Sequence, residues 1–282
     1  MTNVLLLGHG TIAHDLLRMI APELDRGEVK IVGAVVRNPD SHADATYPLF
    51  VGEQLDEALA EADVVVECAG VPAAKAHGPA VVTAGRDLLL SSVGALADRD
   101  AREGMFGGPG RLVVTNGAIG GFDALGAAAQ AGGIDEVSIR TSKLAKALVQ
   151  PWMNADEVER LESLTEADGP LELMIGDPGE AIEKFPSNVN VSVALAWATQ
   201  EYVPAGASVQ ERSDAFERSL RRVRVTIVAD AAAKLSRHEI RAAGSAGTYQ
   251  LQFESTPSPS NPRTSGFTAM SVARDLRGMV RG

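Results

Sequence analysis

Short apolar runs alternate with longer stretches rich in Ala and Leu over the first 115 residues of the chain. The runs lack polar alternation, which is typical of strands buried on both faces of a parallel sheet. They occupy residues 4–7, 29–36, 63–67, 88–91 and 112–115. The stretches between them predict helices at 11–20, 53–60, 73–84 and 96–104. This repeated order of strand and helix predicts an α/β fold with a doubly wound parallel sheet.

The pattern changes after residue 116, where apolar and polar residues alternate. The clearest case, residues 223–229, is typical of a sheet with one face in water. Residues 244–247 predict a hairpin turn, and an apolar helix at 191–199 can cover the other face. The remaining strands are expected at 136–141, 171–175, 238–243 and 248–254, after a helix at 122–130. We therefore expect a second, α+β domain at residues 117–261.

The C-terminal stretch 264–281 has apolar side chains near helical spacing, among them Met270, Ala273 and Leu276. We expect this helix to pack back on the first domain. The predicted division is therefore a first domain of residues 1–116 plus 262–282, and a second domain between these two segments.

The loop after the first strand reads Gly8-His9-Gly10-Thr11-Ile12-Ala13, a GxGxxA pattern between a buried strand and a helix. In a Rossmann-type domain the first glycine allows the tight turn, the second lets the backbone approach a pyrophosphate, and the alanine lets helix and strand pack closely. The phosphates lie at the helix N-terminus, where N–H groups favour anions. We expect Gly8, Gly10, Thr11, Ile12 and Ala13 to bind a dinucleotide; the alternative is a plain strand-turn-helix.

The end of the second strand bears on the choice between NAD and NADP. NAD-selective sites usually have Asp or Glu there, but here the sequence reads Val35-Val36-Arg37-Asn38. The guanidinium of Arg37 can stack on adenine or pair with a 2′-phosphate. The hypothesis is that NADP is accepted, and the alternative is that Arg37 is a solvated loop residue. The cofactor prediction is therefore NAD or NADP.

Charge and composition exclude several classes of protein. Among 282 residues there are 26 Lys and Arg against 37 Asp and Glu, so the formal net charge of −11 argues against nucleic-acid binding. No apolar run approaches a membrane span and no leader precedes the first strand, so a soluble cytoplasmic protein is expected. The five His and the single cysteine, Cys68, lack metal-ligand spacing, so no metal site is predicted and His9 is left without a role.

Several segments along the chain together resemble the L-aspartate dehydrogenase family. The FPSNVNV, HEI and SPSNPRTS segments are the most specific in combination. The segments are GHGTIA (8–13), ECA (67–69), SVGAL (92–96), NGAIGGFDAL (116–125), FPSNVNV (185–191), HEI (238–240) and SPSNPRTS (258–265).

This resemblance implies an oxidoreductase that moves a hydride from the α-carbon of L-aspartate to NAD(P), giving iminosuccinate. The imine hydrolyses to oxaloacetate and ammonia or feeds NAD biosynthesis. His238 matches the family's catalytic histidine, and Ala118 and Asn190 match contacts on the nicotinamide side. The resemblance also implies a homodimer acting on a small amino-acid substrate.

The chemistry of the residues is consistent with these roles. Histidine handles protons near neutral pH, as an amino-acid dehydrogenase requires; the alternative for His238 is a surface or edge-strand histidine. Asn188 is interpreted as a helix cap. Cys68 and Ala69 follow the third strand close to the expected cofactor, and Cys68 is interpreted as a small buried side chain rather than a catalytic thiol.

Two departures from the family pattern concern the substrate. The family's Arg-Lys-Pro-Pro run is replaced here by a segment in which Lys143 and Lys146 precede Trp152, and residues 176–181 lack the family's arginine. A dicarboxylate needs cations for both carboxylates. Two alternatives therefore stay open: a same-fold dehydrogenase or imine reductase for another amino acid or amine, and a non-catalytic dinucleotide-binding sensor. Residues 200–220 suggest a solvated helix, with a lid or an oligomer contact as alternatives.

Overall fold

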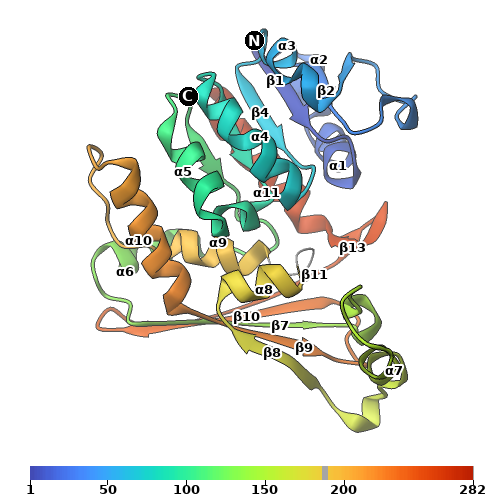
Figure 1. Cartoon of the computed structure of the whole chain (residues 1–282), viewed down its shortest axis with the longest axis vertical. Coiled ribbons are helices and arrows are strands. Elements are labelled where there is room, and N and C mark those ends of the chain that lie inside the picture. The colour runs from blue at the N-terminus through green and yellow to red at the C-terminus, as the bar shows by residue number, and fades with distance from the viewer. Residues whose placement is uncertain (186–189, 282) are drawn as a thin grey trace. The chain divides into compact units, whose positions relative to one another are not determined.

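The computed structural model describes residues 1–185 and 190–281, and the chain forms two compact units (Figure 1). Unit 1 consists of Met1–Gly117 and Ser258–Gly282, and unit 2 of Ala118–Pro257. The sequence-based division placed residues 258–261 in the second domain, whereas they fall in unit 1. The Ser258 hydroxyl donates a 2.6 Å hydrogen bond to the buried carboxylate of Asp15 within that unit.

Unit 1 contains a parallel sheet of six strands in the described residues, ordered β3-β2-β1-β4-β5-β6. This is the order of a dinucleotide-binding Rossmann fold. Alternate residues such as Val4 and Leu6 join the core that α1 and α11 cover, while Leu5 and Leu88 are equally buried on the other face. Burial on both faces is what the unbroken apolar runs predicted. The strands are β1 (Thr2–Leu7), β2 (Val29–Val35), β3 (Leu49–Phe50), β4 (Val64–Glu67), β5 (Asp87–Leu90) and β6 (Leu112–Val114).

The helices of unit 1 follow the strands as expected, except that the short helix α2 was not predicted and one helix is shifted. The helix predicted at 96–104 is a 3-10 turn over Val93–Ala97 followed by α5, because the Asp98 side chain accepts a hydrogen bond from the backbone N–H of Ala101 and caps a new helix there. The helices are α1 (Thr11–Met19), α2 (Ala21–Asp25), α3 (Leu55–Leu59), α4 (Val71–Thr83), α5 (Arg99–Gly107) and α11 (Gly266–Arg281).

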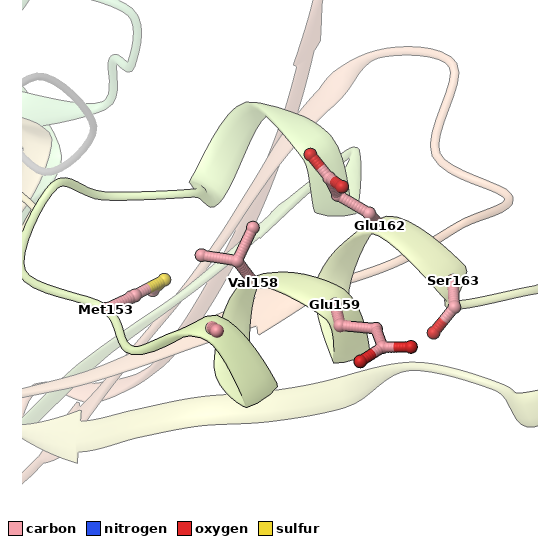
Figure 2. A pocket seen from close by; sticks show the side chains of 6 residues that line it. Met153, Val158, Glu159, Glu162 and Ser163 are labelled. Atoms are coloured by element: carbon pink, nitrogen blue, oxygen red, sulfur yellow. The ribbon is translucent and has the colours of Figure 1, made fainter.

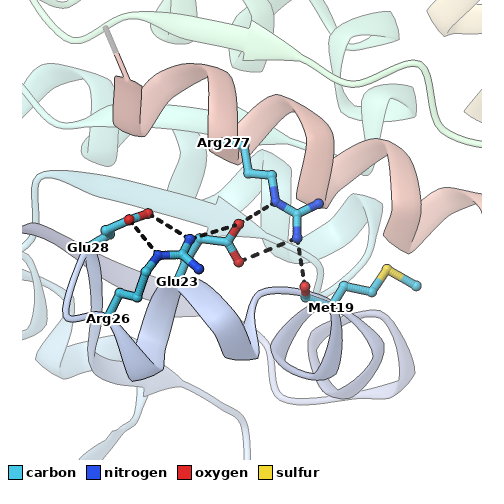
Figure 3. Close-up of polar contacts among 5 residues, drawn as sticks. All are labelled: Met19, Glu23, Arg26, Glu28 and Arg277. Carbon is cyan, nitrogen blue, oxygen red and sulfur yellow. Dashed lines mark hydrogen bonds and ion pairs between the residues drawn. The ribbon is translucent and has the colours of Figure 1, made fainter.

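The C-terminal helix α11 is held in unit 1 by an ion pair as well as by its apolar face (Figure 3). Arg277 donates from Nε to Glu23 Oε1 at 2.7 Å and from Nη2 to the carbonyl of Met19 at 2.7 Å. Arg26 pairs with Glu28 beside it at 2.6 Å. The helix therefore completes the core of unit 1 although it lies more than a hundred residues beyond the sixth strand in the sequence.

Unit 2 contains a mixed sheet of five strands in the described residues, ordered β11-β10-β7-β9-β8. Only β7 and β9 run parallel; the other neighbours are antiparallel, and β10 and β11 form the hairpin predicted around residues 244–247. The strands are β7 (Glu136–Lys143), β8 (Leu171–Gly176), β9 (Val223–Ala229), β10 (Ser236–Gly244) and β11 (Gly247–Ser255). A separate pair, β12 (Pro257–Ser258) and β13 (Asn261–Ser265), leads into α11.

Two helices of unit 2 were missed by the sequence analysis, α7 and α8. The segment 200–220, expected as a solvated helix, contains α10, which opens with a capping box between Ser208 and Glu211. The helices are α6 (Phe122–Gln130), α7 (Ala155–Ser163), α8 (Pro178–Lys184), α9 (Asn190–Ala198) and α10 (Val209–Arg222). None of the helices in the described part of the chain is long and apolar enough to cross a membrane.

Candidate functional site

The glycine loop of unit 1 has the backbone geometry that its sequence predicts. Gly8 has a φ of +100°, and a Cβ there would lie 2.8 Å from the Cα of Ala69. Only glycine fits this turn, because the backbone conformation and the close approach both exclude a side chain. At Gly10, by contrast, an added Cβ would have no described atom within 4 Å. The second glycine therefore borders open space, as a backbone that receives a ligand requires.

Helix α1 begins immediately after Gly10, which has no side chain with which to cap it. The N–H groups of its first turn, starting with Thr11 and Ile12, are therefore available to an external anion, and the helix dipole adds to this attraction. Ala13 is fully buried and lets α1 pack closely on the sheet. These residues lie as expected for the binding of a pyrophosphate.

A buried carboxylate that the sequence analysis missed organises the neighbouring loops. Glu67 ends β4 and is fully buried. Its oxygens accept hydrogen bonds from the backbone N–H groups of Ala69 (2.8 Å), Gly70 (3.0 Å), Ser91 (3.2 Å) and Ser92 (2.7 Å), and from the Ser92 hydroxyl (2.9 Å). Burial raises the pKa of Glu67, and these donors oppose the rise. One side chain thus fixes the loops after β4 and β5.

Cys68 and Ala69 lie against the glycine loop. The Cys68 thiol donates to the carbonyl of Gly8 at 3.6 Å, and the Cys68 backbone N–H donates to Leu7 at 2.9 Å. Burial, reinforced by the charge of Glu67, raises the pKa of the Cys68 thiol well above its usual range. The thiol therefore stays protonated, which agrees with the interpretation that Cys68 is not a catalytic thiol, although its side chain is only partly buried.

Arg37 follows β2 and is exposed. No hydrogen bond or ion pair of its side chain is found among the described residues. The next residue, Asn38, caps the 3-10 turn Pro39–Ser41 by accepting from the backbone N–H of Asp40. Both alternatives for Arg37, a cofactor contact and a solvated loop residue, are compatible with this position.

In unit 2, His238 lies on an interior strand. Strand β10 is flanked by β7 and β11, and the side chain is only 3% exposed, which excludes the alternative of an exposed or edge-strand histidine. Its Nδ1 lies 3.0 Å from the hydroxyl of Thr141, its cross-strand partner on β7. No partner of Nε2 is found among the described residues. Burial, and then the charge of Lys143, lower the pKa of His238 to about 3, so the imidazole is neutral at pH 7.

Lys143 lies two residues beyond Thr141 on β7, so both side chains are on the face of the sheet that carries His238. Burial lowers the pKa of Lys143 to about 8, which leaves it largely protonated at neutral pH. Lys146 is exposed on the following turn. The structure therefore brings a neutral histidine and a cation together, and of the two lysines considered from the sequence only Lys143 has this position.

The two residues expected near the nicotinamide also belong to unit 2. Ala118 is buried, and two residues later a Cβ on Gly120 would lie 3.4 Å from Phe253, the β11 partner of His238. Asn190 is the first residue of α9, which packs on β9. Asn188, interpreted as a cap, lies outside the described residues.

A surface pocket of about 510 Å³ lies beside α7 in unit 2, and none of these residues lines it (Figure 2). Glu159 and Glu162 are its charged lining residues, with Met153, Ala155, Val158 and Ser163 around them. Two carboxylates repel an anionic substrate. This pocket is therefore a poor candidate for binding a dicarboxylate.

Comparisons with known proteins match both units. The family model "Aspartate dehydrogenase, C-terminal" matches residues 123–279, and "Homoserine dehydrogenase, NAD binding domain" matches residues 8–107. The L-aspartate dehydrogenase of Ruegeria pomeroyi is 34% identical over 281 residues, covering 97% of this chain and 91% of its own. The L-aspartate dehydrogenase of Methanococcus maripaludis is 34% identical over 232 residues, covering 79% and 76%.

Among solved structures, the aspartate dehydrogenase of Thermotoga maritima superposes with a TM-score of 0.70 at 23% identity, covering 99% of this chain and 97% of that one. A homoserine dehydrogenase from Thiobacillus denitrificans gives a TM-score of 0.55 at 19% identity, covering 99% and 73%. At these identities the likeness supports the fold, which is the Rossmann-type α/β sheet with a second α+β part that the sequence predicted.

Proposed function

Because this chain belongs to the aspartate dehydrogenase family, we propose that it catalyses the NAD(P)-dependent oxidative deamination of L-aspartate, giving iminosuccinate and, after hydrolysis, oxaloacetate and ammonia. The observation that carries the proposal is the pair formed by His238 and Lys143. A buried neutral imidazole and a cation lie on one face of the unit 2 sheet. Proton transfer and carboxylate binding require these two kinds of group.

The glycine loop fits a dinucleotide. Gly8, Gly10 and the first turn of α1 would hold the pyrophosphate, and Cys68, Ala69 and Arg37 would line the neighbouring strand ends. When bound, the nicotinamide accepts the hydride from the substrate α-carbon. We assign this role to unit 1, which consists of Met1–Gly117 and Ser258–Gly282, and substrate binding to unit 2, Ala118–Pro257.

His238 is proposed as the general acid/base. If Nδ1 donates its proton to the Thr141 hydroxyl, the lone pair of Nε2 remains available to take a proton from the substrate amine or from the water that adds to the imine carbon. Thr141 acts as a positioning residue, because its hydroxyl holds the ring through Nδ1.

Lys143 is proposed to bind a substrate carboxylate, with Lys146 as a further candidate. A protonated lysine supplies one of the cations that the anion requires. A carboxylate placed beside His238 also opposes the effect of Lys143 and raises the pKa of the imidazole from its low value in the free protein. Substrate binding would thereby make His238 a stronger base. Ala118 and Asn190 are proposed to contact the nicotinamide side.

The test is the absorbance of NAD(P)H during incubation of the purified protein with a panel of amino acids and either cofactor. Reduction confined to L-aspartate is expected. Turnover only with another amine, or only in the reductive direction, would assign the chain to a different substrate. Cofactor binding without any turnover would identify a dinucleotide sensor. The homodimer implied by the resemblance and the cytoplasmic location expected from the sequence stay predictions.

A further inference from the structure

A cluster of nitrogen and oxygen ligands lies beside the glycine loop in unit 1. It joins three segments: His9 within the loop, His14 on α1, and Asp44 in the connection between β2 and β3. The Nε2 atoms of the two histidines are 3.1 Å apart. The Oδ2 atom of Asp44 lies 3.6 Å from His9 Nε2 and 3.1 Å from His14 Nε2.

These three separations have the size that a tetrahedral metal ion imposes. Ligand atoms bound at roughly 2.0–2.2 Å from Zn²⁺ lie about 3.3–3.6 Å apart. The three observed distances bracket that range, with one Asp44 oxygen facing both imidazoles. An ion at the centre of this triangle would need only small movements of the side chains.

The surroundings of His9 favour a metal ligand. Its Nδ1 lies 2.8 Å from the hydroxyl oxygen of Tyr47. A metal-binding histidine characteristically donates the N–H of its second nitrogen to an oxygen acceptor, most often a carboxylate, a backbone carbonyl or water. Tyr47 is itself half-buried, and burial raises its pKa to about 12, so it stays a neutral hydroxyl.

The cluster is also accessible to an ion from solvent. The side chain of His9 is 3% exposed, but those of His14 and Asp44 are 39% and 63% exposed. The buried histidine can therefore act as the fixed ligand, while the exposed pair closes on the ion. The fourth position of a tetrahedral site remains open to water.

We propose that His9, His14 and Asp44 bind a divalent transition-metal ion of the zinc type. The sequence analysis predicted no metal site, because His9 and His14 are five residues apart and Asp44 lies thirty residues beyond His14. The bound ion ties the glycine loop to the connection between β2 and β3. It therefore couples metal binding to dinucleotide binding, a consequence that rests on the proposed function, whereas the metal site itself does not.

The site is tested by titrating the metal-free full chain with Co²⁺ and recording the visible bands of tetrahedral Co²⁺, with Zn²⁺ as competitor. One equivalent of Co²⁺ is expected to give the bands, and Zn²⁺ to abolish them. His14→Ala and Asp44→Asn should each weaken Co²⁺ binding by at least about 100-fold, since loss of an outer partner alone costs about 10–100-fold. Tyr47→Phe tests that outer partner and should weaken binding about tenfold.

Two other histidines of unit 1 serve as controls. The His42 ring lies 5.1 Å from that of His9 outside the ligand set, and His77 lies on α4. His42→Ala and His77→Ala should bind Co²⁺ like the wild-type protein, and thermal melting checks that every variant is folded. Bands absent from the wild-type protein, or unchanged in both folded ligand variants, would overturn the proposal.

The coupling is tested separately, by measuring the Kd of NADH and NADPH from fluorescence with and without Zn²⁺. A Zn²⁺-dependent Kd in the wild-type protein, lost in Asp44→Asn, is expected, because coupling between two sites is reciprocal. An unchanged Kd would overturn the coupling and leave the metal site standing. Metal binding without any dinucleotide binding would instead contradict the proposed function.

Discussion

Glu67 in unit 1 and His238 in unit 2 are both buried titratable side chains, and their surroundings differ. In unit 1 the carboxylate of Glu67 receives five hydrogen bonds, four of them from backbone N–H groups of two loops. In unit 2 the imidazole of His238 has one hydrogen-bond partner, Thr141, among the described residues. Lys143, a like charge for the protonated ring, lies close enough to lower its pKa.

This difference separates a structural group from a reactive one. A buried group whose every acceptor position is occupied holds its neighbours in place and has nothing left to offer a substrate. His238 has a ring nitrogen for which no partner is found among the described residues, and its protonated form is disfavoured. A bound ligand can occupy that nitrogen and change its pKa, and pKa values shifted in this way are typical of functional sites. We therefore assign Glu67 to the architecture of the dinucleotide loops, and His238 to chemistry.

The largest effect is expected from His238→Ala. Loss of the general acid/base should lower kcat about 10²–10⁴-fold, because proton transfer by a positioned side chain contributes that much. Steady-state kinetics with L-aspartate measures it, with His77→Ala on α4 as the control. Near-wild-type turnover in His238→Ala would show that His238 has no catalytic role, and His238 and Glu67 would then both be structural residues.

Acid should destabilise the protein through the same histidine. The unfolded chain takes up a proton near the ordinary histidine pKa of about 6.5, whereas folded His238 takes one up only near pH 3. Between these values the unfolded state binds more protons, so stability falls as the pH falls, by at most roughly 4–5 kcal/mol in total from this group. Denaturant unfolding against pH should show a shallower fall in His238→Gln; identical slopes would contradict the low pKa.

The structural role of Glu67 is tested by Glu67→Ala. Removing the carboxylate takes the side-chain acceptor from the backbone N–H groups of Ala69, Gly70 and Ser92, whereas that of Ser91 keeps the backbone carbonyl of residue 67 as an acceptor. At about 1–3 kcal/mol for each unsatisfied group, and with water replacing part of the loss, we expect about 3 kcal/mol of destabilisation. Thermal melting measures it, with exposed Glu53→Ala as the matched control. A stable Glu67→Ala protein that had lost only turnover would give Glu67 a catalytic role instead.

Much of the fold could be predicted from the sequence, because the signals are local. The apolar runs of unit 1 are buried on both faces, and the alternation at 223–229 coincides with β9. Helices α7 and α8 were missed although each begins with a capping box, Asn154 with Glu157 and Asp177 with Glu180. That signal was available in the sequence. Strand β3 has only two residues and leaves no pattern to find.

The residues of the candidate site that belong to a sequence motif could be predicted. Their partners, which are distant in the sequence and meet only in the folded chain, could not. The glycine loop and His238 stand out in the sequence. Glu67 could have been noticed as an ionisable residue that ends an apolar strand, but its partners come from two separate loops. The pairing of Thr141 with His238 depends on strand register, which joins residues 97 positions apart. Register of this kind is decided by tertiary packing.

The proposal that the backbone at Gly10 approaches the pyrophosphate is tested by Gly10→Ala. The added methyl group enters open space, so stability should change little, but it occupies the place expected for a pyrophosphate. We expect the KM for the dinucleotide to rise about tenfold, equivalent to about 1.4 kcal/mol. Gly206→Ala in unit 2 is the matched control, because it also adds a methyl group in open space at a position without a positive φ. Equal KM values for the two variants would remove the loop from cofactor binding.

The smallest effect is expected from Arg37→Ala, because the other proposed cofactor contacts in unit 1 come mainly from backbone groups. Arg37 is exposed, and a guanidinium in water gains little from a phosphate compared with a buried pair. Arg37→Ala should therefore raise the KM for NADP only by about three- to tenfold, and leave that for NAD nearly unchanged. Arg18→Ala, which alters an exposed arginine on α1, serves as the control. A strong NAD preference that Arg37→Ala does not alter would assign Arg37 to the solvated loop, and cofactor recognition in unit 1 would then rest on its backbone.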